Sequence, residues 1–468
     1  MNTKMKLLAT GAAALVASFQ AQAFGPTQAP DIIFYTGGAA AQANSFQAFA
    51  AKLMTSFDVY TDAACGTAGK NYRAVYGTIG TTLPDGSAIP ASLVGKKVFV
   101  EYGDNGGAFI NGIDGIARSH AIQLVNFINA QGANNTVACG AGSSTQYSTA
   151  VSGTTTVATH IPLLGFSDQE STLFVGANLP AGSTALTAAE LGKVNSTPLY
   201  ESVYGVAENS LLAAQKTNFT TAEVAAIEAG FYKNWNQLKG DVGAFNGVAL
   251  PAGGIVLIDR NAGSGTKAAA NQYFLHNPGS KAFGGNVAPK TGSANIGDCT
   301  GYTVYSDCVQ STAGAVVSAL NAANAAGARA VGILDMSNQP GASDHYTYAS
   351  LNSVDIQGIT AVTCGNAVAN PFEPAQVVSG AYDFYFSNTL NFRIANVGGQ
   401  PFEGDGSVSS DFIDAYNAVA SDPATEVSVP GQLLDPDVAG TPAGNPWDSC
   451  ITKGTRHQNS TAPVQLTF

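Results

Sequence analysis

The stretch GIVLIDRNAGSGTKAAANQYFL, residues 254–275, is the part of the chain that says most about its fold. Residues 254–259 form a short apolar run that is typical of a buried strand. Residues 267–275 have helical apolar spacing, and a Gly-rich turn joins the two segments. Similar apolar runs alternate with amphipathic stretches along the whole chain, so the sequence predicts an α/β fold.

Further elements follow from the same patterns. Strands are predicted over residues 32–35, 97–102, 160–166 and 330–334. Helices are predicted over residues 45–57, 221–238, 311–326 and 410–420. In the second of these helices Val224, Ile227 and Phe231 share one face.

The length of 468 residues predicts two lobes, because single cores stop growing at roughly 250–300 residues. No clear linker interrupts the pattern, so the chain is expected to cross between the lobes more than once. The predicted boundaries are a signal peptide at 1–23, a first lobe at 24–200, a second lobe at 201–336, a return to the first lobe at 337–430, and a Pro- and Gly-rich tail at 431–468 that packs on the first lobe.

The first residues indicate export. Lys4 and Lys6 precede an apolar run over residues 7–17, and Ala21-Gln22-Ala23 provides a cleavage site, as in secretory signal peptides. A membrane anchor is the alternative, but the run is shorter than the about 20 residues that a spanning helix needs. No cysteine follows the cleavage point, so we expect a periplasmic or secreted protein, without a lipid or membrane insertion.

The charge of the chain limits its partners. The net charge is −12, and it becomes −14 without residues 1–23, which carry two lysines and no acid. Such a field repels nucleic acid, so no nucleic-acid partner is expected. A small anion is not excluded, because the nearest groups govern a buried site.

The six cysteines suggest three disulfides in an oxidising compartment, out of about 15 possible pairings. The disulfide candidates are Cys65, Cys139, Cys299, Cys308, Cys364 and Cys450. We favour the pairs 299–308, 65–139 and 364–450. Zinc is a poor alternative because CxxC pairs are absent and the histidines are scattered, so no metal or cofactor is expected.

The turn from Arg260 to Thr266 is the best candidate for a binding site. A helix that opens on Gly-Ser-Gly-Thr offers free backbone N–H groups, two hydroxyls and the positive end of its dipole, from Ser264, Gly265 and Thr266. Arg260 adds a planar fork of donors for an oxyanion. The alternative is an ordinary strand-to-helix turn with a surface arginine. The spacing fits neither a P-loop nor a dinucleotide fingerprint.

Two other strand ends carry similar turns. One contains Asp104, Asn105 and Gly106, and the other contains Ser167 and Asp168. Ligands of open α/β sheets bind beyond the carboxyl ends of the strands, so we expect these residues to join Arg260 at one site.

These stretches, in this order, resemble the periplasmic phosphate-binding proteins that serve ABC transporters. The segment 165–168 resembles the family's Gly-Ala-Ser-Asp, and 260–266 fits its Arg-x-x-x-Ser-Gly-Thr. Weaker similarities lie at 198–209, 221–235, 330–333 and 379–382. The resemblance runs with gaps from about residue 32 to residue 420 and marks a divergent member.

The resemblance implies a two-lobed type II periplasmic-binding fold that closes on a hinge over a buried anion. Arg260 would pair with the anion, while Ser264, Gly265 and Thr266 would donate hydrogen bonds. Asp168 would accept a hydrogen bond from a protonated oxyanion. The family would imply a monomer that delivers phosphate to an ABC permease.

The chain departs from the family at three positions. Ala41 stands where the family has a ligand-binding Thr, Asp104 where it has a Ser, and Ala262 where it has an acid. A second carboxylate beside a phosphate should weaken binding. We therefore hypothesise that Asp104 orients Arg260 in place of the missing acid.

The leading interpretation is an exported protein that binds a small oxyanion, foremost phosphate, and has no catalytic residues. The five histidines follow no metal or triad spacing. A secreted phosphatase-like hydrolase and a surface or adhesion protein that keeps the fold without the ligand remain as alternatives.

Overall fold

The computed structural model describes residues 29–61, 71–125, 137–138, 146–148, 157–278, 305–356, 362–364, 368–370, 374–394, 406–426, 429, 432–436, 450–455 and 465–466. The predicted signal peptide lies outside these residues, as do Cys65, Cys139 and Cys299. Within the described ranges no helix has the length and apolar character needed to cross a membrane.

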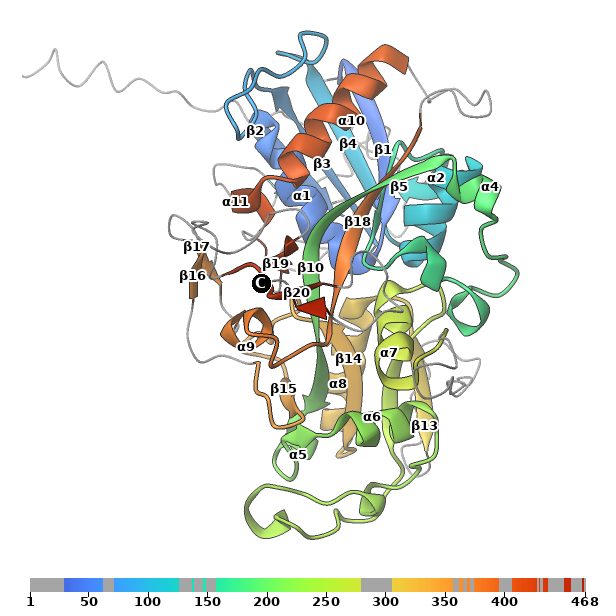
Figure 1. Ribbon diagram of the computed structural model, residues 1–468, viewed down its shortest axis with the longest axis vertical. Helices are drawn as coiled ribbons and strands as arrows, with labels where there is room; N and C mark the ends of the chain where they lie inside the picture. The colour runs from blue at the N-terminus through green and yellow to red at the C-terminus, as the bar shows by residue number, and fades with distance from the viewer. Residues whose placement is uncertain are drawn as a thin grey trace, which may run out of the picture.

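The chain forms an elongated α/β molecule with two lobes, each built on its own apolar core (Figure 1). The first lobe, at the top of the view, has a sheet in which β1 (Ile32–Gly38) lies parallel to β4 (Lys97–Gly103) and β9 (Leu164–Ser167). Antiparallel strands β3 (Tyr72–Ile79) and β2 (Met54–Thr61) extend this sheet. Helices α1 (Ala43–Lys52) and α10 (Gly406–Ala420) cover it.

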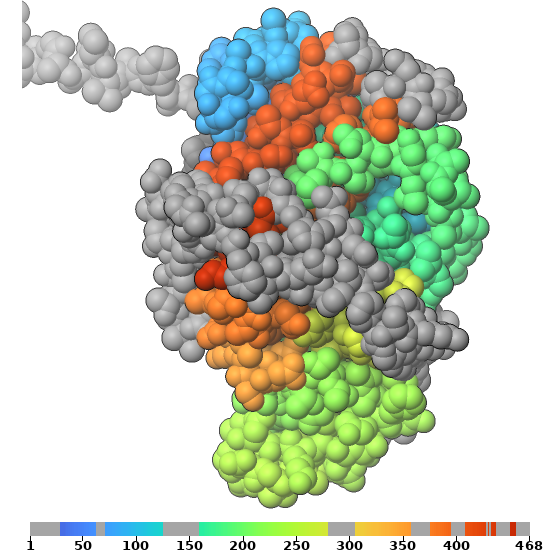
Figure 2. All heavy atoms as spheres, in the orientation of Figure 1, coloured from blue at the N-terminus to red at the C-terminus, as the bar shows by residue number. Residues whose placement is uncertain are grey.

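The second lobe has a smaller parallel sheet, in which β12 (Val256–Arg260) lies between β13 (Ser306–Gln310) and β14 (Ala330–Asp335). Helices α6 (Thr221–Glu228), α7 (Gly265–Leu275) and α8 (Ala313–Ala325) pack around it. Figure 2 shows the green and yellow-green segments forming the lower end of the molecule.

Two long strands join the lobes. Strand β10 (Val194–Asn209) pairs with β18 (Tyr385–Arg393) along its first part and with β14 and β15 (Tyr346–Leu351) along its last part. The β10–β18 register shifts between Pro198 and Glu201. The connection between the lobes is therefore a pair of strands with an irregularity in it.

The C-terminal segment contacts both lobes. Strand β19 (Gln432–Leu434) pairs with β10, and the Gln432 amide donates to the Ser45 hydroxyl of α1 in the first lobe. Leu433, Leu434 and Ile451 belong to the core of the second lobe. The tail was expected to pack on the first lobe, and the described part of it lies across the junction.

The remaining elements are short. They are helices α2 (Gly115–Arg118), α4 (Ala188–Leu191), α5 (Ser210–Ala213), α9 (Pro374–Val378) and α11 (Pro423–Glu426), and strands β5 (Ile122–Val125), β6 (Val137–Ala138), β7 (Gln146–Ser148), β8 (Val157–His160), β11 (Asn218–Phe219), β16 (Val362–Cys364), β17 (Val368–Asn370), β20 (Gly454–Thr455) and β21 (Gln465–Leu466). A π-helical turn over Ala108–Asp114 leads into α2.

Several predicted boundaries are wrong. The helix predicted over 45–57 ends at Lys52 because the chain then pairs with β3. The helix predicted over 221–238 ends at Glu228, since Gly230 has a φ of 69°, and Phe231 is 69% exposed. The strand predicted over 160–166 is interrupted at 161–163.

The lobe boundaries also differ from those that the sequence suggested. Residues within 346–356 and 377–386 contribute to the core of the second lobe, although 337–430 were expected to return to the first. The reason is pairing, because β15 lies against the last part of β10.

Cys308 and Cys450 are disulfide-bonded, and none of the described cysteines is free. The three favoured pairings stay predictions, because three of the six cysteines lie outside the described residues.

Candidate functional site

The carboxyl ends of the parallel strands of both lobes point to the junction between them. Strands β1, β4 and β9 run parallel in the first lobe, and β12, β13 and β14 run parallel in the second. The turn after β4 touches the turn after β12, since the Phe109 N–H donates to the Gly263 carbonyl at 3.0 Å. The expected meeting of loops from different strands is thus present in the fold.

The turn after β12 is shaped to start a helix. Gly263 has a φ of 91°, a conformation that L residues with a side chain rarely adopt. Ser264 then takes the extended N-cap conformation, and its Oγ accepts the Lys267 N–H at 3.4 Å. The first N–H groups of a helix have no partner inside it, so the backbone N–H groups of Gly265 and Thr266 are free donors at the N-terminus of α7.

Arg260 is buried at the end of β12 and is only 4% exposed. Its Nη2 donates to the Ser311 carbonyl at 3.1 Å, whereas its Nε has no hydrogen-bond partner in the described chain. Burial lowers the pKa of the guanidinium, and the charges of Asp168, Asp104 and Asp335 counteract this effect. The guanidinium of Arg260 is thus influenced by three carboxylates, and its Nε–H has no acceptor in the described chain.

Asp168 reaches from the first lobe to the first residue of α7. A Cβ built on Gly265 would lie 1.5 Å from Asp168 Oδ1, so only glycine permits this approach. Asp168 is 1% exposed, and its Oδ1 has no hydrogen-bond partner in the described chain. Burial raises the pKa of Asp168 to about 7, although Arg260 counteracts the rise.

A third polar atom without a partner belongs to Thr266, the second residue of α7. The Thr266 hydroxyl is buried and makes no hydrogen bond in the described part of the chain. Buried polar groups are nearly always hydrogen-bonded, and three that are not lie around the start of α7. A guanidinium N–H, a hydroxyl and a carboxylate oxygen are what a protonated oxyanion requires.

The other predicted residues make contacts of their own. The Ser167 hydroxyl donates to the Gln169 carbonyl at 2.5 Å, which uses its only proton. The Asn105 amide donates to Gln123 at 3.0 Å and accepts from Asn111 at 3.1 Å. Gly106 follows in the same turn. Asp104 is buried, and its charge acts on Arg260.

Sequence reasoning missed two residues of this region. Asp335 ends β14, and its carboxylate accepts the Ser337 N–H at 3.1 Å and the Asn338 amide at 2.7 Å. The Tyr204 hydroxyl donates to the Asp168 carbonyl at 3.2 Å. The strand-end rule that selected Arg260 also applies to Asp335, since β14 is parallel to β12. No sequence signal marks Tyr204.

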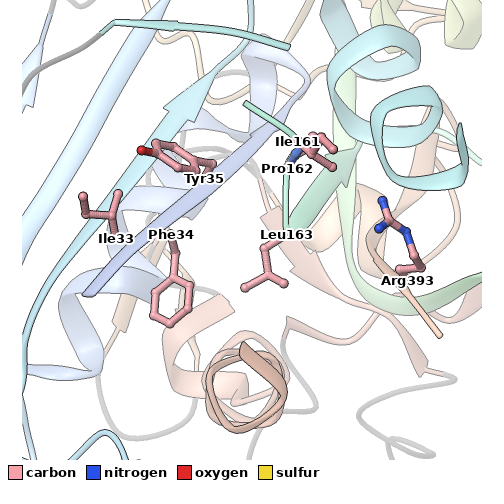
Figure 3. A pocket seen from close by; sticks show the side chains of 7 residues that line it. All are labelled: Ile33, Phe34, Tyr35, Ile161, Pro162, Leu163 and Arg393. Atoms are coloured by element: carbon pink, nitrogen blue, oxygen red, sulfur yellow. The ribbon is translucent and has the colours of Figure 1, made fainter. Parts of the chain in front are cut away.

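A pocket in the first lobe lies away from this site (Figure 3). It is lined mainly by apolar residues of β1 and of the segment 161–163. Arg393 also lines it, and in the figure its guanidinium points to the opposite side from Phe34 and Leu163. Among the described residues no group of three His, Cys, Asp or Glu side chains is arranged to hold a metal ion.

Comparisons with known proteins identify structural neighbours only. No family model and no curated protein matches the chain. A putative phosphate ABC transporter substrate-binding protein from Clostridium perfringens, solved with bound phosphate, is 12% identical, with 84% of this chain and 95% of that chain covered and a TM-score of 0.41.

A phosphate-binding protein from Stenotrophomonas maltophilia is 13% identical, with 82% of this chain and 89% of that chain covered and a TM-score of 0.36. PstS from Borrelia burgdorferi is 12% identical, with 85% and 96% covered and a TM-score of 0.34. Many of the structural neighbours are thus phosphate-binding proteins.

Proposed function

We propose that this chain is an exported solute-binding protein that captures a small oxyanion, foremost phosphate, between its two lobes. The observation that carries the proposal is the set of three buried polar atoms without partners, Arg260 Nε, Thr266 Oγ1 and Asp168 Oδ1. Leaving such atoms unpaired costs about 1–3 kcal/mol each, and a bound oxyanion removes that cost. The sequence motifs at 165–168 and 260–266 support the same interpretation.

The ligand is expected to carry a proton. Arg260 is the cation, and Asp168, Asp104 and Asp335 surround it, so a further dianion adds to an excess of negative charge. An anion with a hydroxyl can donate to Asp168 Oδ1 instead of repelling it. Phosphate and arsenate meet this requirement near neutral pH, whereas sulfate has no proton to give.

Capture is proposed to involve a hinge in the two strands that join the lobes. Donors come from α7 in the second lobe and the acceptor Asp168 comes from the first, so the site is complete only when the lobes meet. The shift of register between Pro198 and Glu201 is a place where β10 can bend. Delivery to an ABC permease is the proposed use of the captured ligand.

A thermal-shift series tests the ligand. The protein is dialysed free of phosphate and heated with phosphate, arsenate, sulfate, molybdate or tungstate. A ligand at a hundred times its Kd stabilises the fold by about 2.7 kcal/mol, so phosphate and arsenate should raise the Tm by several degrees and sulfate should not. No shift with any oxyanion would mean that the fold is kept without this ligand.

The proposed orienting role of Asp104 has a test of its own. Asp104→Ser restores the residue type that the resembling family carries at this position. If Asp104 orients Arg260, the substitution should weaken phosphate binding in equilibrium dialysis. Tighter binding would show instead that Asp104 repels the ligand.

Export is tested by the N-terminus of the protein recovered from outside the cytoplasm. We propose that it begins at Phe24, after Ala23. Intact-mass measurement of the recovered chain decides this, and retention of residues 1–23 would contradict it.

A further inference from the structure

Lys267 is a buried cation in an unfavourable place. It is the third residue of α7, and its side chain is 8% exposed. A positive charge near a helix N-terminus is repelled by the helix dipole, and burial adds a cost of desolvation. Two carboxylates offset these costs, because Lys267 Nζ contacts Asp259 Oδ2 and lies 3.4 Å from Glu228 Oε2.

The contact with Asp259 connects Lys267 to the strand end that carries Arg260. Asp259 Oδ1 accepts the backbone N–H of Arg260 at 2.7 Å, while Asp259 Oδ2 accepts from Lys267. Ser264 Oγ accepts the backbone N–H of Lys267. The Asp259 carboxylate therefore holds the residues on both sides of the turn 261–264. One oxygen binds Arg260 before the turn, and the other binds Lys267, whose backbone N–H is bonded to Ser264 at its end.

Glu228 ties the same turn to a neighbouring helix. It is the last residue of α6 and is 2% exposed. The charge of Asp307 on β13 also acts on Lys267. Lys267 thus joins α7 to a second helix and to the sheet at the base of the turn.

We propose that Lys267 is a positioning residue that holds the 260–266 turn in its anion-binding shape through its ion pairs with Asp259 and Glu228. The proposal rests on the function proposed above. Lys267 does not touch the anion, and its effect on binding passes through Asp259 to the Arg260 backbone and through α7 to Ser264.

The chain offers a matched control in Lys216. This lysine is also buried in the second lobe, and its Nζ lies 3.3 Å from Glu223 Oε1 and 3.2 Å from the Lys239 carbonyl. It lies outside the 260–266 turn. Lys216→Met therefore removes the ion pair of a buried lysine in the same lobe and leaves the contacts of that turn in place.

The experiment compares Lys267→Met, Lys267→Arg and Lys216→Met in the full chain. Phosphate Kd is measured by equilibrium dialysis, and backbone hydrogen exchange of residues 260–268 is measured without phosphate. Lys267→Met should weaken binding about tenfold or more and speed exchange in the turn. Lys267→Arg should restore part of both, and Lys216→Met should leave the Kd within about twofold of wild type.

Equal changes in the two Met variants, or unchanged exchange in the turn of Lys267→Met, would overturn the positioning role. Absence of phosphate binding by the wild type would defeat the proposed function, and the exchange measurement alone would then decide whether Lys267 holds the turn. If Lys267→Met does not fold, Glu228→Gln is compared with Glu223→Gln in the same measurements and with the same criteria.

Discussion

Two buried arginines end two strands of this protein, and they differ in the helix end that they face. Arg393 ends β18, and its Nε and Nη2 both lie 3.3 Å from the Ile116 carbonyl in the short helix α2. Arg260 ends β12, and the helix beside it begins at Gly265. Burial lowers the pKa of both guanidinium groups.

The difference shows why the Nε of one buried arginine is hydrogen-bonded within the protein and that of the other is not. The carboxyl end of a helix carries partial negative charge, so α2 itself supplies an acceptor for Arg393. The amino end of α7 carries partial positive charge and offers donors, so it cannot supply one for Arg260. Arg260 and the start of α7 are thus both hydrogen-bond donors. The Arg260 Nε has no acceptor in the described chain, and the nearby Asp168 Oδ1 has no donor.

The strongest test of this comparison replaces each arginine by methionine. Arg260→Met should weaken phosphate binding about a hundredfold, since a charged hydrogen bond is worth about 1.5–3 kcal/mol. Arg393→Met should lower the Tm and leave the Kd nearly unchanged. Isothermal titration and thermal unfolding of both variants give these values, and a similar loss of binding in both would break the distinction.

Gly265→Ala tests whether the contact between Asp168 and α7 matters. The new Cβ would overlap Asp168 Oδ1, so the carboxylate must move away from the start of α7. Phosphate binding should weaken by about tenfold or more. Gly314→Ala is the control, because a Cβ at this position in α8 meets nothing within 4 Å. Equal Kd values in the two variants would show that the contact is dispensable.

The pH dependence of stability reports on Asp168. Because burial raises its pKa to about 7, the folded state holds this proton more tightly than the unfolded state. The free energy of unfolding should therefore fall as the pH rises from about 4 to about 7. Glu228 and Asp335 act in the same direction, since their pKa values are raised too.

Asp168→Asn separates the contribution of this residue. The Tm of the variant should exceed that of wild type only slightly at pH 5 and by a few degrees more at pH 8, in phosphate-free buffer. A Tm difference that stays constant between these pH values would show that Asp168 does not titrate in this range.

The smallest expected effect concerns two buried threonines. The Thr266 hydroxyl has no partner in the described chain, whereas the Thr36 hydroxyl donates to the Glu101 carbonyl at 2.7 Å. Thr266→Val should weaken phosphate binding about fivefold and leave the ligand-free Tm unchanged or slightly higher. Thr36→Val should lower that Tm by a few degrees. A lower ligand-free Tm for Thr266→Val would indicate that its hydroxyl already has a structural role.

Local signals predicted the central turn well. The strand, the glycines and the helix around Arg260 follow one another within a few residues, and the structure changes only the helix start, from residue 267 to Gly265, because Ser264 caps it. Helix α6 was overextended because Phe231 continues its apolar spacing. Gly230 was the stronger signal, because its left-handed backbone conformation ends the helix although the apolar spacing continues to Phe231.

Features that depend on distant partners could not be derived from the sequence. Strand β10 is long because different strands pair with its two parts. The close approach of Asp168 to Gly265 depends on how the lobes meet, and no local pattern encodes this distance. The contribution of Tyr204 depends on β10 lying beside the end of β9, which is also a tertiary arrangement.

The C-terminal segment has a consequence for the order in which the molecule assembles. Gln432 bonds to Ser45, which is 387 positions away in the chain. Contacts between such distant residues form late, because a long loop must close first. A chain cut before Gln432 loses Leu433, Leu434 and Ile451 from the core of the second lobe, so that core is complete only after β19 docks.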